Sequence, residues 1–261
     1  MILKILLLSL FLLPLQLQAE SSIIVLDVKE GQSVLIKNND EGLLIDTGHM
    51  GQSTSILNKL HQYGIKRINS IILTHLHPDH AGGYFRLKEA FLFSNVFSNC
   101  QPLPDNVQPD STRWIYETLQ STQEHHCLKA GDVLSFHDAK LTILWPYEFI
   151  NNNLNRHSLI INITINENDV LLMADTGLIV EQELSSRATL PKNISTLIVG
   201  HHGANDATSM GLLRRTNPEF AVISVNKNNI RGYPSGDVIK RLKLMGIRIL
   251  RTDTHGDIPL R

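Results

Sequence analysis

Short apolar runs separated by turn residues dominate the chain after its N-terminal segment. The runs SIIVLDV, SVLIKN and GLLIDTG have strand length, with Gly, Asn or Asp between them, which predicts a three-stranded meander over residues 22–48. Apolar residues then recur with helical spacing from Ile56 to Tyr63, which predicts an amphipathic helix over residues 53–64. The run SIILTH predicts a buried strand that ends at His75.

The rest of the chain repeats this alternation after an irregular stretch. The proline-rich segment 95–112 is predicted to be a loop, and helices are predicted near residues 111–121, 179–186, 210–215 and 237–245. Strands are predicted at AGDVLSF, LTILWP, HSLIINITI, DVLLMAD, TLIVG, FAVISV and IRILRT. Two halves of comparable make-up, each with strands and helices, predict an α/β (α+β) fold with two mixed sheets face to face and helices outside. No linker divides residues 20–261, so one domain is expected there.

The first residues have the pattern of a targeting segment. MILKILLLSLFLLPLQLQAES joins Lys4 to an apolar stretch broken by Pro14 and a small-residue cleavage site at Ala19. This predicts a signal peptide over residues 1–19 and a periplasmic or secreted protein without stable membrane insertion after cleavage. An uncleaved anchor is the alternative, disfavoured because the apolar stretch is shorter than the roughly 20 residues that span a bilayer.

Charge is balanced overall but uneven along the chain. The formal net charge is −1 from 24 basic and 25 acidic residues, and loss of residues 1–19 removes only Lys4, leaving 23 basic and 25 acidic residues. Residues 212–261 hold ten Lys or Arg against four Asp or Glu. A solvated helix face around DVIKRLKLMG is the favoured interpretation, and an anion-attracting flank beside an active site is the alternative.

Two further features of the middle segment allow alternatives. Cys100 and Cys127 are the only cysteines, so a disulfide between them is expected in an oxidising compartment, with two free thiols as the alternative. The aromatic residues Trp114 and Tyr116 on the predicted helix are expected to pack against the core, although they could instead line a substrate groove.

The segment ILTHLHPDHAGG carries the strongest chemical signal. His75, His77, Asp79 and His80 lie within six positions, directly after a buried strand. Neutral imidazoles and carboxylates are common ligands of zinc and related ions, and a spacing of two lets one loop present both imidazoles to one ion. A metal site is therefore predicted here.

Further candidate ligands follow or precede other predicted strands. They are His157, Asp175 and the pair His201 and His202. In a face-to-face packing of sheets these strand ends can converge at one edge, which would supply the three or four ligands that a metal ion requires.

These residues carry a resemblance to the metallo-β-lactamase fold, marked by the HxHxDH motif formed by His75, His77, Asp79 and His80. The chain resembles most the hydrolase domain of the ComEC family of DNA-uptake proteins, through LDVKEGQSVLI, LLIDTG, LTILWP, NRHSLIINI, LLMAD, VGHHG, AVISV and TDTHGDI. The resemblance implies a four-layer αββα sandwich. It also implies two divalent metal ions, most readily zinc, with manganese or iron as alternatives.

Carried over by position, the ligands of the family fall into two sets. His75, His77 and His157 would hold the first ion, Asp79, His80 and His202 the second, and Asp175 would bridge them. Asp79 and His201 are the expected catalytic residues, with His201 protonating the leaving group. The reverse assignment of His201 and His202 stays open, and Asp46 resembles a position that supports the metal loop.

The resemblance implies a secreted hydrolase that uses a metal-bridging hydroxide as nucleophile. A phosphodiesterase or nuclease-like activity on an anionic small molecule or nucleic acid is favoured; a phosphorylcholine-type esterase, a lactonase, a thioester hydrolase and a non-catalytic metal-binding protein are the alternatives. Asp175 stands where β-lactamases of this fold usually have cysteine or serine, which argues against antibiotic hydrolysis. The chain departs from the family in loops: Lys29-Glu30-Gly31-Gln32, Tyr233-Pro234 and residues 204–209.

Overall fold

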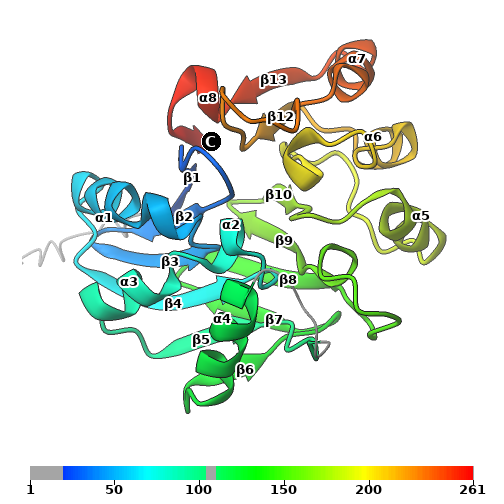
Figure 1. Ribbon diagram of the computed structural model, residues 1–261. Helices are drawn as coiled ribbons and strands as arrows, with labels where there is room; N and C mark the ends of the chain where they lie inside the picture. Colours follow the sequence, from blue (N-terminus) through cyan, green and yellow to red (C-terminus); the bar gives the residue numbers. More distant parts are fainter. Residues whose placement is uncertain (1–19, 104–109, 261) are drawn as a thin grey trace, which may run out of the picture.

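Two seven-stranded sheets lie face to face, and helices cover the outer face of each (Figure 1). The computed structural model describes residues 20–103 and 110–260. The four-layer αββα sandwich expected from the sequence is confirmed. The predicted signal peptide, residues 1–19, lies outside the described residues, as do residues 104–109 of the proline-rich segment.

The first sheet has the strand order β14-β1-β2-β3-β4-β5-β6. Its strands pair antiparallel from β14 to β3 and parallel from β3 to β6, so the predicted opening meander is its antiparallel half. Its members are β1 (Ser22–Val25), β2 (Val34–Asn38), β3 (Glu41–Ile45), β4 (Arg67–Leu73), β5 (Asn95–Ser98), β6 (His125–Cys127) and β14 (Ile258–Leu260).

The second sheet repeats this plan, with the strand order β13-β12-β11-β10-β9-β8-β7. Pairing is antiparallel from β7 to β10 and parallel from β10 to β13. Its members are β7 (Val133–Phe136), β8 (Ala139–Trp145), β9 (Ile160–Ile165), β10 (Asn168–Leu172), β11 (Thr196–Ile198), β12 (Phe220–Ile223) and β13 (Arg248–Arg251).

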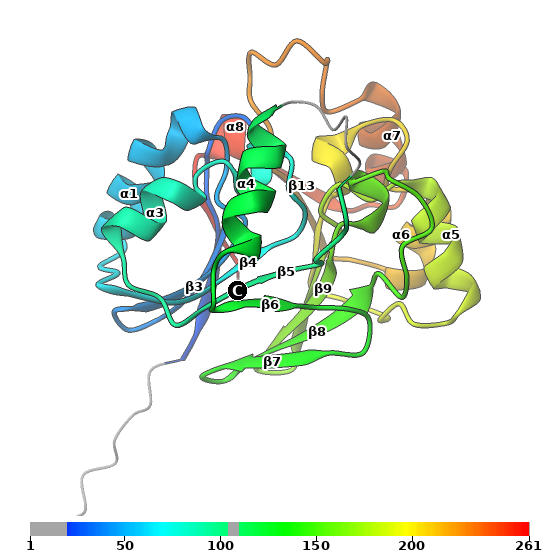
Figure 2. The ribbon, with the colours of Figure 1, turned by 60° about the horizontal axis from the view of Figure 1, so that its bottom comes forward.

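Helices α1, α3 and α4 lie over the first sheet, and α5, α6 and α7 lie over the second (Figure 2). The helices are α1 (Ser53–Gln62), α2 (Pro78–Ala81), α3 (Tyr84–Ala90), α4 (Asp110–Gln120), α5 (Leu178–Ser186), α6 (Met210–Thr216), α7 (Gly236–Leu244) and α8 (Thr252–His255). Short 3-10 helices occur at Met50–Gln52, Asn155–His157 and Gly200–Gly203.

Three apolar layers hold these four layers together. One lies between the sheets and includes Ile72 and Ile161, both fully buried. A second joins the first sheet to its helices through residues such as Leu60, and a third joins the second sheet to its helices through residues such as Leu184 and Leu242. Burial of apolar surface on both faces of each sheet fixes the strand ends that carry the candidate ligands.

Three short strands were not predicted from the sequence. The prediction of a loop was wrong for Asn95–Ser98, which is strand β5, and the short strands β6 and β14 were not predicted. Each has only three or four residues, and β14 joins the first sheet from the end of the chain, a pairing that local pattern cannot reveal.

The expected disulfide is confirmed. Cys100 and Cys127 form it with an S–S distance of 2.08 Å, which ties the ends of β5 and β6 together. Core packing is confirmed for Tyr116 and not for Trp114, which stacks on the ring of Phe85 with centroids 4.2 Å apart but is 52% exposed. Neither aromatic side chain lines a cavity beside the metal-binding motif.

Within residues 20–103 and 110–260, no helix combines the length and the hydropathy that crossing a membrane requires.

Candidate metal centre

The loop after β4 presents the metal-binding motif. His75 and His77 lie in the turn, and Pro78 opens helix α2, which carries Asp79 and His80. Proline is favoured at the first helical position because its missing N–H would have no partner there. The following Gly83 lets the loop approach β3, since a Cβ on this residue would lie 2.2 Å from the carbonyl oxygen of Thr47.

The second sheet supplies the remaining candidates from the ends of two parallel strands. Asp175 follows β10, and His201 and His202 form part of the 3-10 turn after β11. Both histidines have left-handed backbone conformations, with φ of 49° for His201 and 54° for His202. Such conformations are costly for non-glycine residues and cluster at functional sites.

One group of possible ligand atoms comes from His75, His80 and Asp175, whose side chains are all buried. Nε2 of His75 lies 3.9 Å from Oδ2 of Asp175, and Nε2 of His80 lies 3.1 Å from its Oδ1. His77 adjoins this group, because its Nδ1 lies 3.1 Å from Nε2 of His75.

A second group comes from Asp79, His80 and His202. Nε2 of His202 lies 3.5 Å from Oδ2 of Asp79 and 3.5 Å from Oδ1 of Asp175. Asp175 therefore lies within 4 Å of ring nitrogens in both groups. The structure thus brings together His75, His77, Asp79, His80, Asp175 and His202.

The donor atoms of these groups fit a bound cation. Nε2 of His80, Nε2 of His202 and Oδ1 of Asp175 are buried and make no hydrogen bond in the part of the chain that the structure describes. Buried polar atoms without a partner are rare and costly in folded proteins. Imidazole nitrogens and a carboxylate oxygen aimed at one another in this way are suited to divalent ions of the zinc type.

Buried groups behind the ligands fix their orientation. Oδ2 of Asp46 lies 2.7 Å from Nδ1 of His80, and Nδ1 of His202 lies 2.9 Å from the carbonyl oxygen of Ser224. An acceptor at Nδ1 keeps the proton there and leaves the Nε2 lone pair free for a metal ion. Asp46 thus supports the metal loop, as the sequence suggested.

Burial and neighbouring charges shift the pKa values of the histidines in different directions. Burial lowers the pKa of His75 well below its ordinary value and also lowers the pKa of His77, so both rings are neutral. For His80, burial acts in the same direction, but the carboxylates of Asp175 and Asp46 outweigh it and raise the pKa well above its ordinary value.

The carboxylates are ionised despite their burial. Burial alone would raise the pKa of Asp79, but the neighbouring His202 and the charge of His80 hold it below its usual range. Burial would likewise raise the pKa of Asp175, and the same two histidines keep it well below its usual value. In the cluster, ionised carboxylates lie next to histidine rings. The protons on these rings lie where a bound cation would also be stabilised by the carboxylates.

Two candidates lie outside these groups. His157 is fully buried, but Nδ1 lies 3.0 Å from the carbonyl oxygen of Asn153, and Nε2 accepts a hydrogen bond from the backbone N–H of Ile150 at 3.1 Å. Both ring nitrogens of His157 thus have partners in their own loop, and His157 is in neither group of possible ligand atoms. His201 lies at the rim, with Nε2 3.9 Å from Oδ2 of Asp175, and His202, not His201, is in a group of possible ligand atoms.

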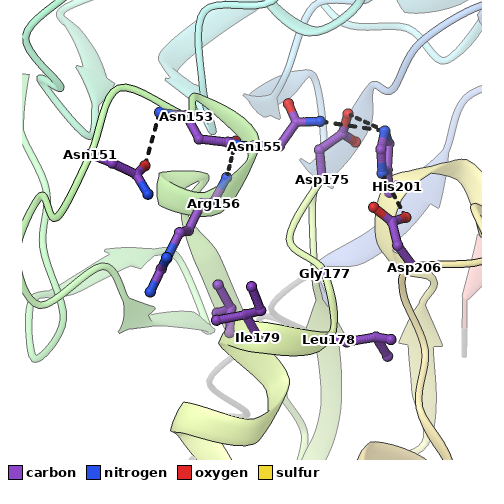
Figure 3. A pocket seen from close by; sticks show the side chains of 11 residues that line it. Asn151, Asn153, Asn155, Arg156, Asp175, Gly177, Leu178, Ile179, His201 and Asp206 are labelled. Carbon is purple, nitrogen blue, oxygen red and sulfur yellow. Dashed lines mark hydrogen bonds and ion pairs between the residues drawn. The ribbon is translucent and has the colours of Figure 1, made fainter.

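A cavity of about 360 Å³ opens above the cluster. Its lining includes Glu30 and Tyr233, which belong to the loops that depart from the ComEC pattern, and Asn155 and Arg231, which the sequence analysis did not assign to the site. Asn155 also lines an adjoining cavity of about 430 Å³, together with Asp175 and His201 (Figure 3). The only feature of the sequence that could have pointed to Asn155 is its position two residues before His157.

Some basic residues of the C-terminal region 212–261 lie away from the site, as the interpretation of a solvated helix face expects. One lies beside the site, as the interpretation of an anion-attracting flank expects. Lys240 and Lys243 lie on α7 away from the metal-binding motif, and Arg251 pairs with Asp253. Arg231 alone among the region's described basic residues lines the cavity, with Nη1 3.8 Å from Oδ2 of Asp79.

Comparison with known proteins agrees with this geometry. A family model described as the metallo-beta-lactamase superfamily matches residues 26–96. Competence protein ComA of Neisseria gonorrhoeae is 27% identical over 238 residues, which cover 91% of this chain and 32% of that protein. ComE operon protein 3 of Bacillus subtilis is 26% identical over 275 residues, which cover 94% of this chain and 33% of that protein. The chain thus spans about a third of the length of these relatives.

Solved structures resemble the whole described fold. The metallo-beta-lactamase fold protein YhfI from Bacillus subtilis superposes with a TM-score of 0.60 at 14% identity, covering 92% of this chain and 99% of that one. The likeness at this identity concerns the fold.

Proposed function

Because the chain carries a metallo-β-lactamase domain that resembles part of ComEC-type proteins, we propose that it is a dinuclear metal-dependent hydrolase that cleaves phosphodiesters. Nucleic acid or a nucleotide is the proposed substrate. One observation carries the dinuclear part: the Asp175 carboxylate lies near ring nitrogens on both sides, with Oδ2 3.9 Å from Nε2 of His75 and Oδ1 3.5 Å from Nε2 of His202. A carboxylate in this position can bridge two adjacent ions.

The residues of the cluster have different proposed roles. His75 and His77 would hold one ion, the group of Asp79, His80 and His202 the other, and Asp175 both. Bound divalent ions would supply a hydrolytic water of lowered pKa and would neutralise charge on the substrate. His201 would give a proton from Nε2 to the leaving group, and Oδ1 of Asp206, 3.3 Å from its Nδ1, would hold the ring in place.

The cavity lining favours an anionic substrate. Arg231 is half exposed and carries a permanent positive charge at the cavity's edge, where a phosphate oxygen could pair with it. Tyr233 is the one Tyr, Trp or Phe in this lining, which is too few for the aromatic cage that a choline head group needs. The resemblance to the ComEC family of DNA-uptake proteins supports nucleic acid as the substrate class.

We also propose that the enzyme acts in the periplasm or outside the cell. The disulfide between Cys100 and Cys127 supports this location, because such bonds persist in oxidising compartments.

The test is a substrate panel run on the purified chain after removal of metal and reconstitution with zinc or manganese. We expect cleavage of a chromogenic phosphodiester and of single-stranded DNA, and loss of this activity in His77→Ala and Asp175→Ala. His61→Ala changes a histidine that is exposed on α1 and serves as the matched control. Arg231→Ala should raise KM for DNA and leave turnover nearly unchanged.

Turnover of a lactone, a thioester or a phosphomonoester without any phosphodiester cleavage would overturn the substrate class. Stoichiometric metal without activity on the whole panel would favour a binding protein.

A further inference from the structure

We propose that Asn155, and not His157, completes the first metal-binding group, with its amide oxygen Oδ1 as the ligand beside Nε2 of His75 and Nδ1 of His77. The inference rests on the proposed function in one respect, the binding of metal by this cluster. It would give the first group two imidazoles, an amide oxygen and the shared Asp175 carboxylate.

The turn that carries Asn155 is fixed next to the metal loop. The 3-10 helix Asn155–His157 leads into β9, and the backbone N–H of Leu159 donates to the carbonyl oxygen of Thr74 at 2.9 Å, one residue before His75. Nε1 of Trp145 donates to the carbonyl oxygen of Arg156 at 2.6 Å. The position of Asn155 at the cluster is therefore set by the buried frame.

The side chain of Asn155 spans the gap between the two candidate histidines at the rim. Its Nδ2 lies 3.4 Å from Nε2 of His201, and its side chain also reaches His77. Figure 3 shows the carboxamide pointing toward Asp175 and His201. It lines both cavities that open on the cluster.

The amide oxygen lacks a hydrogen-bond partner. Oδ1 of Asn155 is buried and accepts no hydrogen bond within the described residues, a property that it shares with Nε2 of His80, Nε2 of His202 and Oδ1 of Asp175. The last three atoms belong to the ligand groups, and Asn155 lines the cavity that opens on them. An amide oxygen left unpaired next to His77 is costly unless a cation or water completes it.

His157 cannot take this place without breaking its own contacts. Its Nδ1 lies 3.0 Å from the carbonyl oxygen of Asn153 and its Nε2 3.1 Å from the amide nitrogen of Ile150. Its ring also packs edge-on against Phe149, with centroids 5.4 Å apart. The side chain closes the loop 149–157 onto itself and so holds the turn that presents Asn155.

The choice of ligand has a consequence for the metal. An amide oxygen is a harder and weaker donor than imidazole, and oxygen donors suit manganese, while imidazole suits zinc. The first group should therefore bind zinc more weakly than the second group, which has two imidazoles and the two carboxylates of Asp79 and Asp175. Replacing Asn155 by histidine should strengthen zinc binding and leave manganese binding nearly unchanged.

The experiment titrates chelator-stripped protein with Zn²⁺ and with Mn²⁺ by calorimetry, and records cobalt absorption spectra of the same variants. We expect Asn155→Ala to weaken one of two binding events by roughly tenfold or more, since even groups behind the ligands contribute that much. Asn155→His should tighten that event for Zn²⁺. Asn152→Ala, a change of an exposed asparagine on the same loop, is the matched control and should bind as the unchanged protein does.

Equal metal binding by Asn155→Ala and Asn152→Ala would overturn the inference. Loss of one equivalent in a folded His157→Ala variant would do so as well, with circular dichroism to verify folding. If that variant does not fold, the comparison of Asn155→Ala with Asn152→Ala decides. An unchanged protein that binds no metal would refute the proposed function too. Metal binding that depends on Asn155, without phosphodiester cleavage, would refute only the substrate proposal.

Discussion

Asp46→Asn tests whether a buried carboxylate behind the cluster controls both folding and metal binding. Asp46 is fully buried, and its Oδ1 accepts the backbone N–H of Thr74 at 2.8 Å. Its Oδ2 lies 2.9 Å from Nε2 of Gln32, 2.8 Å from Oγ1 of Thr74 and 2.7 Å from Nδ1 of His80. Asparagine has nearly the same shape but turns one acceptor oxygen into a donor.

The cost to stability follows from the donor that loses its acceptor. With the asparagine oxygen kept on the backbone of Thr74, its NH₂ group would face Gln32 and His80, while the Thr74 hydroxyl can rotate to accept. The NH₂ group of Gln32 then loses its acceptor, whereas Nδ1 of His80 can accept from the new NH₂ group. One unpaired buried donor should lower the free energy of unfolding of the metal-free protein by roughly 1–3 kcal/mol.

The effect on metal binding follows from the tautomer of His80. Beside an NH₂ group, Nδ1 of His80 must accept a hydrogen bond, so its proton moves to Nε2, the atom that faces Asp175 and the second ligand group. A metal ion must then displace that proton. Affinity should fall by about 10–100-fold, the range found for groups that orient ligands.

Urea unfolding in the presence of a chelator measures the first effect, and zinc titration measures the second. Asp40→Asn is the control, because this carboxylate is half exposed and pairs with Lys66 at the surface. A stability within about 0.5 kcal/mol of the unchanged protein would refute the reasoning about the unpaired donor. Reduced stability with unchanged zinc affinity would refute the reasoning about the tautomer.

Two further predictions concern groups away from the cluster. Glu181 is buried and accepts the backbone N–H groups of Thr208 at 2.5 Å and Ser209 at 2.8 Å, so Glu181→Ala should lower the free energy of unfolding by about 2–4 kcal/mol in urea; an unchanged urea midpoint would contradict this. Burial and the charge of Asp257 raise the pKa of Tyr63 to about 12, so the folded state keeps the phenol proton longer than the unfolded chain does. Stability relative to Tyr63→Phe should therefore fall as the pH rises from about 10 to about 12, and parallel pH profiles of the two proteins would contradict the assignment.

The sequence predicts the elements that have strong patterns of their own. Runs such as SIILTH and DVLLMAD are long and apolar enough to be buried strands, and the structure has them as β4 and β10. Strand β6 has the sequence HHC with mostly exposed side chains. Its strand character comes from pairing with β5 through Val96 and Ser98, which a local pattern does not contain.

The sequence predicts a residue of the candidate site where a histidine or an aspartate follows a predicted strand. His75, Asp175 and His202 are such cases, and the structure gathers them. His157 is different because it comes before a strand, β9, in a turn where neighbouring side chains point about 120° apart. Which of Asn155 and His157 faces the cluster depends on the hydrogen bonds of the loop, and no spacing rule supplies these.

Two residues face the same cavity with different structural support, and this separates their roles. Asn155 lies in a turn tied to Trp145 and Thr74 by buried hydrogen bonds, so its position is as fixed as that of the ligands. Arg231 lies on a surface loop, with half of its side chain exposed. A change at Asn155 should therefore alter metal binding, whereas a change at Arg231 should alter substrate affinity without altering bound metal. If both variants lost metal equally, the cavity edge would have to be treated as one coupled unit, and the division between metal binding and substrate selection would fail.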